Sequence, residues 1–381
     1  MEYAEFFRDV SEVADATNSP QYSLIKSLFD EKEYERVLHM VEYSKCSDVD
    51  ILSLCLLSEI FLLEKTSHKS SDSLLKNAED VYSRFSNDGI INFLYAKLLL
   101  RAGGVFEFGL EVLLKSIRLC SWNWEAWLEL SRIVDDDSAV QIYQQYECYK
   151  FYMYERMMYR GEYKELSFRL LSEHRGWCFK EELLGKCYHE MREFEKAVNV
   201  FASLAKNHPF RISGMDVYSN CLFVLERSET LSQLAHHWMR VNPNSFETSV
   251  IAGNYFSLKS QHEKAATFFK RAVTFNPHSV NALILLGHEL VELRNPSAAL
   301  AVYQQAACKN TTSNRGWHAM GQLFELINQH AFAVYYYEKA AKNDPSDSRI
   351  YKALASCYTK LNRSEQANAC LQKIKLSTNK E

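Results

Sequence analysis

The fold is decided by two consecutive stretches that align without a gap. The first reads FETSVIAGNYFSLKSQHEKAATFFKRAVTFNPHS (residues 246–279), and the second reads VNALILLGHELVELRNPSAALAVYQQAACKNTTS (residues 280–313). Each stretch is 34 residues long, and small and aromatic residues hold the same places in both. A fixed period of this size indicates an array of repeated structural units, each stacked on its neighbours.

Four columns of residues continue this period along the chain. Their members are Pro209, Pro243, Pro277 and Pro345; Gly185, Gly253, Gly287 and Gly321; Ala197, Ala265, Ala299, Ala333 and Ala367; and Phe201, Phe269, Tyr303 and Tyr337. The small residues let two helices approach closely, the aromatic rings fill the remaining space, and proline ends the second helix. This pattern is typical of the tetratricopeptide repeat (TPR). We therefore predict an all-α TPR superhelix, an α-solenoid of about ten helical hairpins.

The regularity of the pattern predicts two regions. Clear repeats run over 178–211, 212–245, 246–279, 280–313 and 314–347, and a partial one begins at Ser348. The repeat 212–245 is degenerate, with Ser219 in the glycine column and Leu231 in the alanine column. Gly161-Glu162-Tyr163 resembles the turn inside a hairpin and places a repeat near 147–177, or in a register three residues away. We predict divergent TPR-like hairpins over 1–177, and a regular array with a peptide groove and a C-terminal cap over 178–381.

Composition and motifs exclude several function classes. The chain has 44 basic and 48 acidic residues, so it lacks the basic excess of a nucleic-acid or membrane-surface binder. Its ten cysteines form no CxxC pair, and no phosphate-binding loop, HExxH or GxSxG motif is present. The N-terminal sequence does not resemble a signal peptide. We expect no catalytic residue, metal or cofactor, and a location in the nucleus and cytoplasm.

The remaining candidate is a concave groove. In a TPR array it is lined by positions 2, 5, 9, 12 and 13 of the first helix of each repeat. Amides at these positions can bind a peptide backbone and carboxylates can pair with its Arg or Lys. The alternative is a solvated polar surface or a contact with another subunit. The candidate groove residues are Asp216, Asn220, Glu247, Asn254, His288, Glu292, Gln322 and Glu325. A clamp of Lys, Arg and Asn for a terminal carboxylate is not formed, since position 5 carries Asp216, Val250, Ile284 and His318.

Residues outside the repeat columns carry a closer resemblance. The segments are HPFRISGMDVYSN (208–220), AGNYFSLKSQHEKA (252–265), GWHAMGQ (316–322) and NDPSDSR (343–349). They resemble subunit 8 of the anaphase-promoting complex more than the related subunit 3. The chain ends soon after Ala367, where relatives continue, so we expect a shortened family member.

The resemblance implies a non-catalytic scaffold of a multisubunit ubiquitin ligase that drives mitotic exit. Family members homodimerise through N-terminal repeats and contact other TPR subunits. Their C-terminal groove receives the Arg-containing C-box of a coactivator, and Asn254 and its neighbours match that groove. The alternative is a TPR peptide-docking adaptor or co-chaperone outside that complex.

Overall fold

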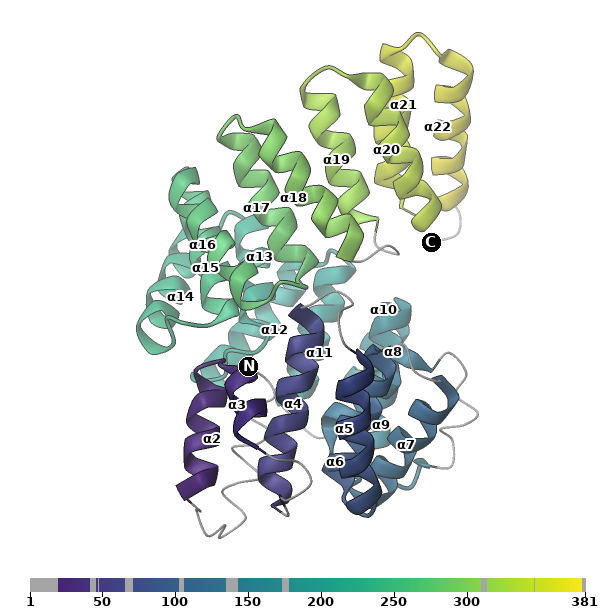
Figure 1. Cartoon of the computed structure of the whole chain (residues 1–381). Helices are drawn as coiled ribbons and strands as arrows, with labels where there is room; N and C mark the ends of the chain where they lie inside the picture. The colour runs from purple at the N-terminus through teal and green to yellow at the C-terminus, as the bar shows by residue number, and fades with distance from the viewer. Residues whose placement is uncertain are drawn as a thin grey trace. The chain divides into compact units, whose positions relative to one another are not determined.

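The computed structural model describes residues 20–41, 46, 48–65, 71–102, 106–134, 143–172, 178–309, 314–345 and 347–378. Over these residues it contains 21 α-helices and no strand. They form two compact units, Met1–Glu162 and Tyr163–Glu381, called here unit 1 and unit 2 (Figure 1). The prediction of an all-α array of hairpins is confirmed.

Unit 1 holds the eight described helices that precede the unit boundary. They are α2 (Pro20–Asp30), α3 (Tyr34–Met40), α4 (Val49–Lys65), α5 (Ser71–Arg84), α6 (Gly89–Arg101), α7 (Phe106–Leu119), α8 (Trp124–Ile133) and α9 (Glu147–Arg160). Side chains cap three of them: Asp48 accepts from the backbone at the start of α4, Asp88 does so for α6, and Asn123 does so for α8.

A cluster of tryptophan and tyrosine rings lies in the core of unit 1. Trp127 of α8 is fully buried, and the rings of Tyr143 and Tyr152 lie 6.3 and 5.6 Å from it. A buried ion pair joins Lys97 of α6 to Glu129 of α8, with 3.3 Å between Nζ and Oε1. These residues follow no 34-residue column, which explains why the sequence pattern fades before residue 178.

Unit 2 holds six hairpins that follow α10 (Tyr163–Ser172). They are α11 (Cys178–Glu190) with α12 (Phe194–Asn207), α13 (Met215–Val224) with α14 (Ser228–Val241), α15 (Phe246–Leu258) with α16 (His262–Phe275), α17 (Val280–Glu292) with α18 (Pro296–Lys309), α19 (Arg315–Leu326) with α20 (His330–Asn343), and α21 (Ser348–Lys360) with α22 (Ser364–Thr378). They match the predicted repeats. Their turns repeat as well, because the left-handed turn residues are 34 apart: Arg192, Glu226, Ser260, Arg294, Asn328 and Asn362.

In the regular repeats of unit 2, the ring of the aromatic column packs directly against the glycine of the glycine column. An added Cβ would lie 2.6 Å from the Phe201 ring at Gly185 and 2.5 Å from the Phe269 ring at Gly253. No side chain larger than hydrogen fits there without displacing the ring. In the degenerate repeat the larger and the smaller side chain change places. Buried Ser219 stands in the glycine column, and buried Ala235 stands in the aromatic column.

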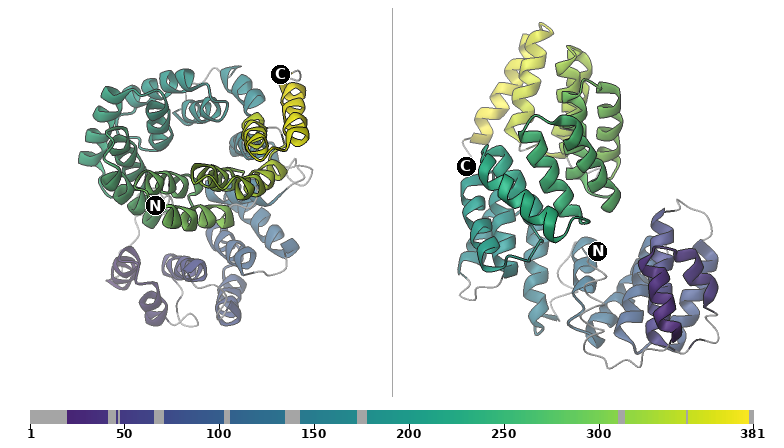
Figure 2. Two further views of the ribbon diagram at one scale, coloured as in Figure 1. Left: turned by 90° about the horizontal axis from the view of Figure 1, so that it is seen from above. Right: turned by 90° about the vertical axis from the view of Figure 1, so that its left-hand side faces the viewer.

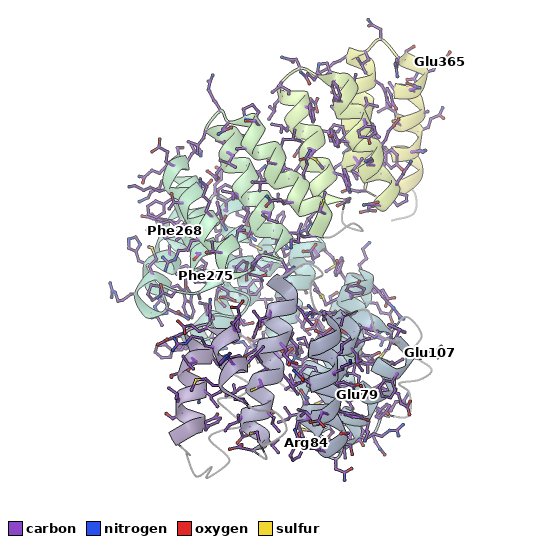
Figure 3. All side chains as sticks on the ribbon, in the orientation of Figure 1. Glu79, Arg84, Glu107, Phe268, Phe275 and Glu365 are labelled. Atoms are coloured by element: carbon purple, nitrogen blue, oxygen red, sulfur yellow. The ribbon has the colours of Figure 1, made fainter. Side chains whose placement is uncertain are left out.

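Aromatic packing also joins the two helices of a hairpin on a second face. Figure 3 labels Phe268 on α16, whose ring stacks on Phe256 of α15 at 5.3 Å between centroids. Figure 2 shows the hairpins of unit 2 following one another round a curve, which gives this unit a concave side.

The unit boundary falls between α9 and α10. The prediction near 147–177 gives both helices, with Gly161 left-handed (φ 79°) in the turn between them. However, α9 packs on α8 and α10 packs on α11. The compact units therefore divide after Glu162, whereas the predicted boundary at 177 lies one helix further along the chain.

Candidate functional site

The concave side of unit 2 holds two adjoining hollows. The first, of about 420 Å³, is lined by the first helices of the hairpins, from α11 to α21. The second lies along α13, α15, α17 and α19. The two share Asn254, His288 and Gln322, so they form one continuous groove.

Position 9 of the repeats forms the floor of this groove. Asn220, Asn254, His288 and Gln322 are 34 residues apart, and all four line the first hollow. Asn254 is only 1% exposed, and its amide nitrogen donates to Ser219 Oγ at 2.9 Å and to Asn220 Oδ1 at 2.7 Å. Asn254 therefore fixes the orientation of the Asn220 side chain, which is half-buried beside it.

Ser219 can accept this hydrogen bond from Asn254 because its repeat has a serine in the glycine column and an alanine in the aromatic column. A glycine there would offer no hydroxyl, and an aromatic ring in place of Ala235 would leave a serine side chain no room. The degenerate repeat therefore supplies a polar contact that the regular repeats cannot make.

Two histidines project into the groove from neighbouring repeats. A hydrogen bond of 2.9 Å joins His288 Nδ1 to the hydroxyl of Tyr303. Desolvation and the charge of His318 lower the pKa of His288, against an opposing effect of Glu292. Desolvation likewise lowers the pKa of His318. Both rings are therefore neutral at pH 7 and present polar atoms without charge.

Carboxylates gather at the second hollow. Glu289 is buried and accepts from Ser257 Oγ at 2.6 Å and from His262 Nδ1 at 2.9 Å. Glu325 accepts from the Tyr337 hydroxyl at 3.1 Å and pairs with Lys360 Nζ at 3.0 Å. Glu292 is exposed and makes no hydrogen bond or ion pair within the described residues. Its carboxylate is available to a basic side chain from outside.

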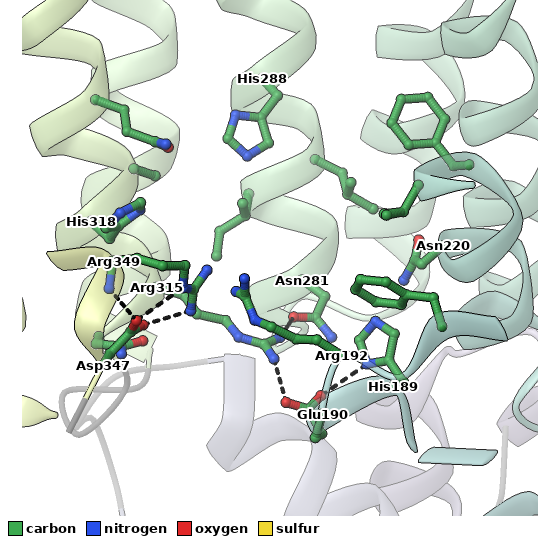
Figure 4. A pocket seen from close by; sticks show the side chains of 18 of the residues that line it. His189, Glu190, Arg192, Asn220, Asn281, His288, Arg315, His318, Asp347 and Arg349 are labelled. Carbon is green, nitrogen blue, oxygen red and sulfur yellow. Dashed lines mark hydrogen bonds and ion pairs between the residues drawn. The ribbon is translucent and has the colours of Figure 1, made fainter. Parts of the chain in front are cut away.

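Guanidinium groups gather at the other end, in the first hollow (Figure 4). Arg315 donates to Glu190 Oε2 at 2.6 Å and to Asn281 Oδ1 at 2.7 Å. This pair joins the first hairpin of unit 2 to the fifth, which are far apart in sequence. Burial alone would raise the pKa of Glu190, but the hydrogen bond from His189 and the charge of Arg315 lower it to about 2.

The groove brings together six of the eight predicted residues. Asn220, Asn254, His288 and Gln322 line the first hollow, and Glu292 and Glu325 line the second. Asp216 and Glu247 lie outside both hollows, half-buried in the first turns of α13 and α15. Burial raises the pKa of Asp216, and the charge of Lys186 opposes this effect.

Part of the groove wall was not predicted from the sequence. His189 and Glu190 occupy positions 12 and 13 of the repeat 178–211, and Arg192 follows in the turn. The position rule finds the first two when it is applied to this repeat. Arg192 lies outside the rule, because it reaches the groove from the turn between two helices.

The described residues contain no group of three or more His, Cys, Asp or Glu side chains that could hold a metal ion. Among the described helices, none is long and apolar enough to cross a membrane.

Comparison with known proteins gives the family. The sequence profile of "Anaphase promoting complex subunit 8 / Cdc23" matches residues 74–166, and a tetratricopeptide repeat profile matches residues 183–210. Anaphase-promoting complex subunit 8 of Arabidopsis thaliana is 30% identical over 312 residues, which are 74% of this chain. The chain belongs to the subunit 8/Cdc23 family.

The match to family members is partial in length. The chain spans 52% of the Arabidopsis subunit 8 and 37% of the Dictyostelium discoideum subunit 8, to which it is 31% identical over 224 residues. The crystal structure of the APC/C hetero-tetramer Cut9-Hcn1 gives a TM-score of 0.63 at 14% identity, over 97% of this chain and 75% of that one. That likeness supports the fold alone, and it agrees with a TPR superhelix.

Proposed function

We propose that this subunit 8/Cdc23 family member is a non-catalytic TPR scaffold of an anaphase-promoting complex, and that unit 2 docks the C-box of a coactivator. Relatives that carry the subunit 8 name support the first part. The second part is carried by one observation: the position 9 side chains form the floor of a groove that is also lined by the exposed carboxylate of Glu292.

The groove suits an extended peptide with an arginine. Gln322 and the fixed Asn220 offer amides to the peptide backbone, whose N–H and C=O groups need partners when they leave water. The neutral rings of His288 and His318 add polar atoms without repelling the arginine. The arginine would pair with Glu292, and with Glu325 once Lys360 is displaced from it.

The test is fluorescence anisotropy of a labelled C-box peptide with the full chain. The control peptide replaces the arginine with alanine. We expect saturable binding that weakens by at least about tenfold in the control, because a charge-assisted pair contributes about 1.5–3 kcal/mol. Equal affinity of both peptides would contradict docking by this groove and would favour a peptide adaptor of another kind.

We propose two further properties because the chain belongs to the subunit 8/Cdc23 family. The chain homodimerises through the hairpins of unit 1, and it assembles with other TPR subunits in the nucleus and cytoplasm. Light scattering of the full chain tests the dimer, which would have twice the 44.3 kDa of one chain. A mass of one chain at high micromolar concentration would contradict it. Co-purification of a tagged chain with other TPR subunits of the complex tests the assembly.

A further inference from the structure

The two ends of the groove carry opposite charges. Glu292 and Glu325 line the second hollow, whereas Arg192, Arg315 and Arg349 line the first. Two carboxylates, those of Glu190 and Asp347, also line the first hollow, so three guanidinium groups face two acids there. Among these five side chains, the guanidinium groups outnumber the carboxylates by one.

The excess charge belongs to Arg192. Arg315 bonds to Glu190 and Asn281, and Arg349 donates from Nε to Asp347 Oδ1 at 2.9 Å. Arg192, in contrast, is exposed and makes no hydrogen bond or ion pair within the described residues. None of its five N–H donors therefore has a hydrogen-bond acceptor among the described residues.

The side chain of Arg192 extends into the groove. Arg192 sits in the turn after α11 with a left-handed φ of 63°, and its side chain lines the hollow opposite α19 and α21. Figure 4 shows it among Arg315, Asn281 and His189. Desolvation lowers the pKa of His318, the charge of Asp347 raises it and the charge of Arg192 lowers it. The charge of Arg192 also opposes the effect of burial, which raises the pKa of Asp347, so the guanidinium faces both of these groups.

We propose that Arg192 is an anion subsite of the groove, which binds an oxyanion of the docked peptide. That oxyanion is the carboxylate of an acidic residue or a phosphate on a modified one, since both accept two parallel N–H donors from a guanidinium. A preferred ligand then places its basic residue at Glu292 and its oxyanion at Arg192. The charge order along the groove fixes the direction in which the peptide lies. This inference rests on the proposed function.

The test compares C-box peptides that differ only in an added pair of residues. Two aspartates or two asparagines are joined to one end of the peptide or to the other. The protein variant is Arg192→Asn, which keeps the left-handed turn because Asn328 and Asn362 hold the same position in later repeats. The control is Arg294→Asn, an exposed arginine at the equivalent turn position (φ 56°) that lines neither hollow.

At low salt, we expect aspartates at one end to tighten binding about three- to tenfold over asparagines, and aspartates at the other end to have little effect. Arg192→Asn removes this gain and Arg294→Asn retains it. A gain that survives in Arg192→Asn, or no gain at either end while the parent peptide binds, overturns the subsite. Phosphoserine in place of the aspartates identifies the source: a larger gain assigns a phosphate, and an equal or smaller one assigns a carboxylate.

A second measurement is independent of the C-box. Inorganic pyrophosphate is titrated onto the full chain, and the ring signal of His318 is followed by NMR. We expect a saturable shift in the wild type and in Arg294→Asn that is absent in Arg192→Asn. If the parent peptide does not bind but this shift is found, the proposed function fails and the anion subsite stands. A shift that is unchanged in Arg192→Asn, or absent in the wild type, contradicts the subsite.

Discussion

In unit 2 an aromatic ring of each regular hairpin rests against a glycine of the partner helix, whereas in unit 1 four tyrosines surround the buried Trp127. The first arrangement repeats every 34 residues, and the second occurs once. A repeated contact constrains each residue column to one size, while a single aromatic cluster constrains only its own members. Unit 2 therefore keeps a regular groove, and unit 1 is free to diverge.

The largest effect should come from the core of unit 1. We expect Trp127→Ala to lower the free energy of unfolding of unit 1 by about 3–5 kcal/mol, because it empties the centre of the aromatic cluster. Hydrogen exchange followed by mass spectrometry should show lost protection in unit 1, while unit 2 keeps its own. The control is Trp122→Ala, since that side chain is 68% exposed. Equal loss of protection in both units would contradict separate cores.

The contact between ring and glycine can be tested by introducing the serine and alanine pair of the degenerate repeat into a regular one. Gly185→Ser alone should cost about 1–3 kcal/mol by crowding the Phe201 ring. Phe201→Ala alone should cost about 3–5 kcal/mol by leaving a cavity. The double variant reproduces the Ser219 and Ala235 pair, so its cost should fall below the sum of the two by about 1 kcal/mol or more. Additive costs in urea unfolding would show that the exchange is not compensatory.

Within the groove, two members of the position 9 column should respond differently. Asn254→Ala should lower the free energy of unfolding by about 1–2 kcal/mol, since Ser219 and Asn220 lose their buried partner. It should also weaken peptide binding, because Asn220 is released. Gln322→Ala, at an exposed position, should weaken binding with no loss of stability. Unchanged stability of Asn254→Ala would remove the positioning role given to Asn254.

The smallest effect should come from the pair that joins the first and fifth hairpins of unit 2. The pKa of Glu190 is lowered from 4.5 to about 2, so its pairing stabilises the fold above pH 4.5 and that stabilisation is lost as the pH falls through about 2. The Arg315 side chain is 40% exposed, so solvent screening limits the contribution to about 1 kcal/mol or less. The stability difference between wild type and Glu190→Gln should follow this pH course. A difference that does not change with pH would assign it to packing.

The fold of unit 2 could be predicted from the sequence because its columns are periodic and each column has one physical role. The position rule also gave the groove floor, from Asn220 to Gln322, because neighbouring repeats present equivalent positions on one side. It did not give the burial of Asn254, which depends on Ser219 in the preceding repeat. Nor could it give the contact of Glu190 with Arg315, since curvature over several hairpins brings these residues together.

In unit 1 the packing of the core could not be predicted from the sequence. The sequence predicts divergent TPR-like hairpins over 1–177, but the packing of Lys97 with Glu129 and of Trp127 with its tyrosines leaves no period in the sequence. Such contacts are specified by the fit of individual side chains, and local sequence does not encode that fit.

The central claim is that Glu292 in the groove of unit 2 receives the arginine of the docked peptide. A double-mutant cycle tests it most directly, with Glu292→Gln in the protein and Arg to Ala in the C-box peptide. The matched control is Glu263→Gln, an exposed glutamate of α16 that lines neither hollow. The account predicts a coupling free energy of about 1.5–3 kcal/mol for Glu292 and about zero for Glu263. Additive losses at Glu292, or equal coupling at both glutamates, would contradict it.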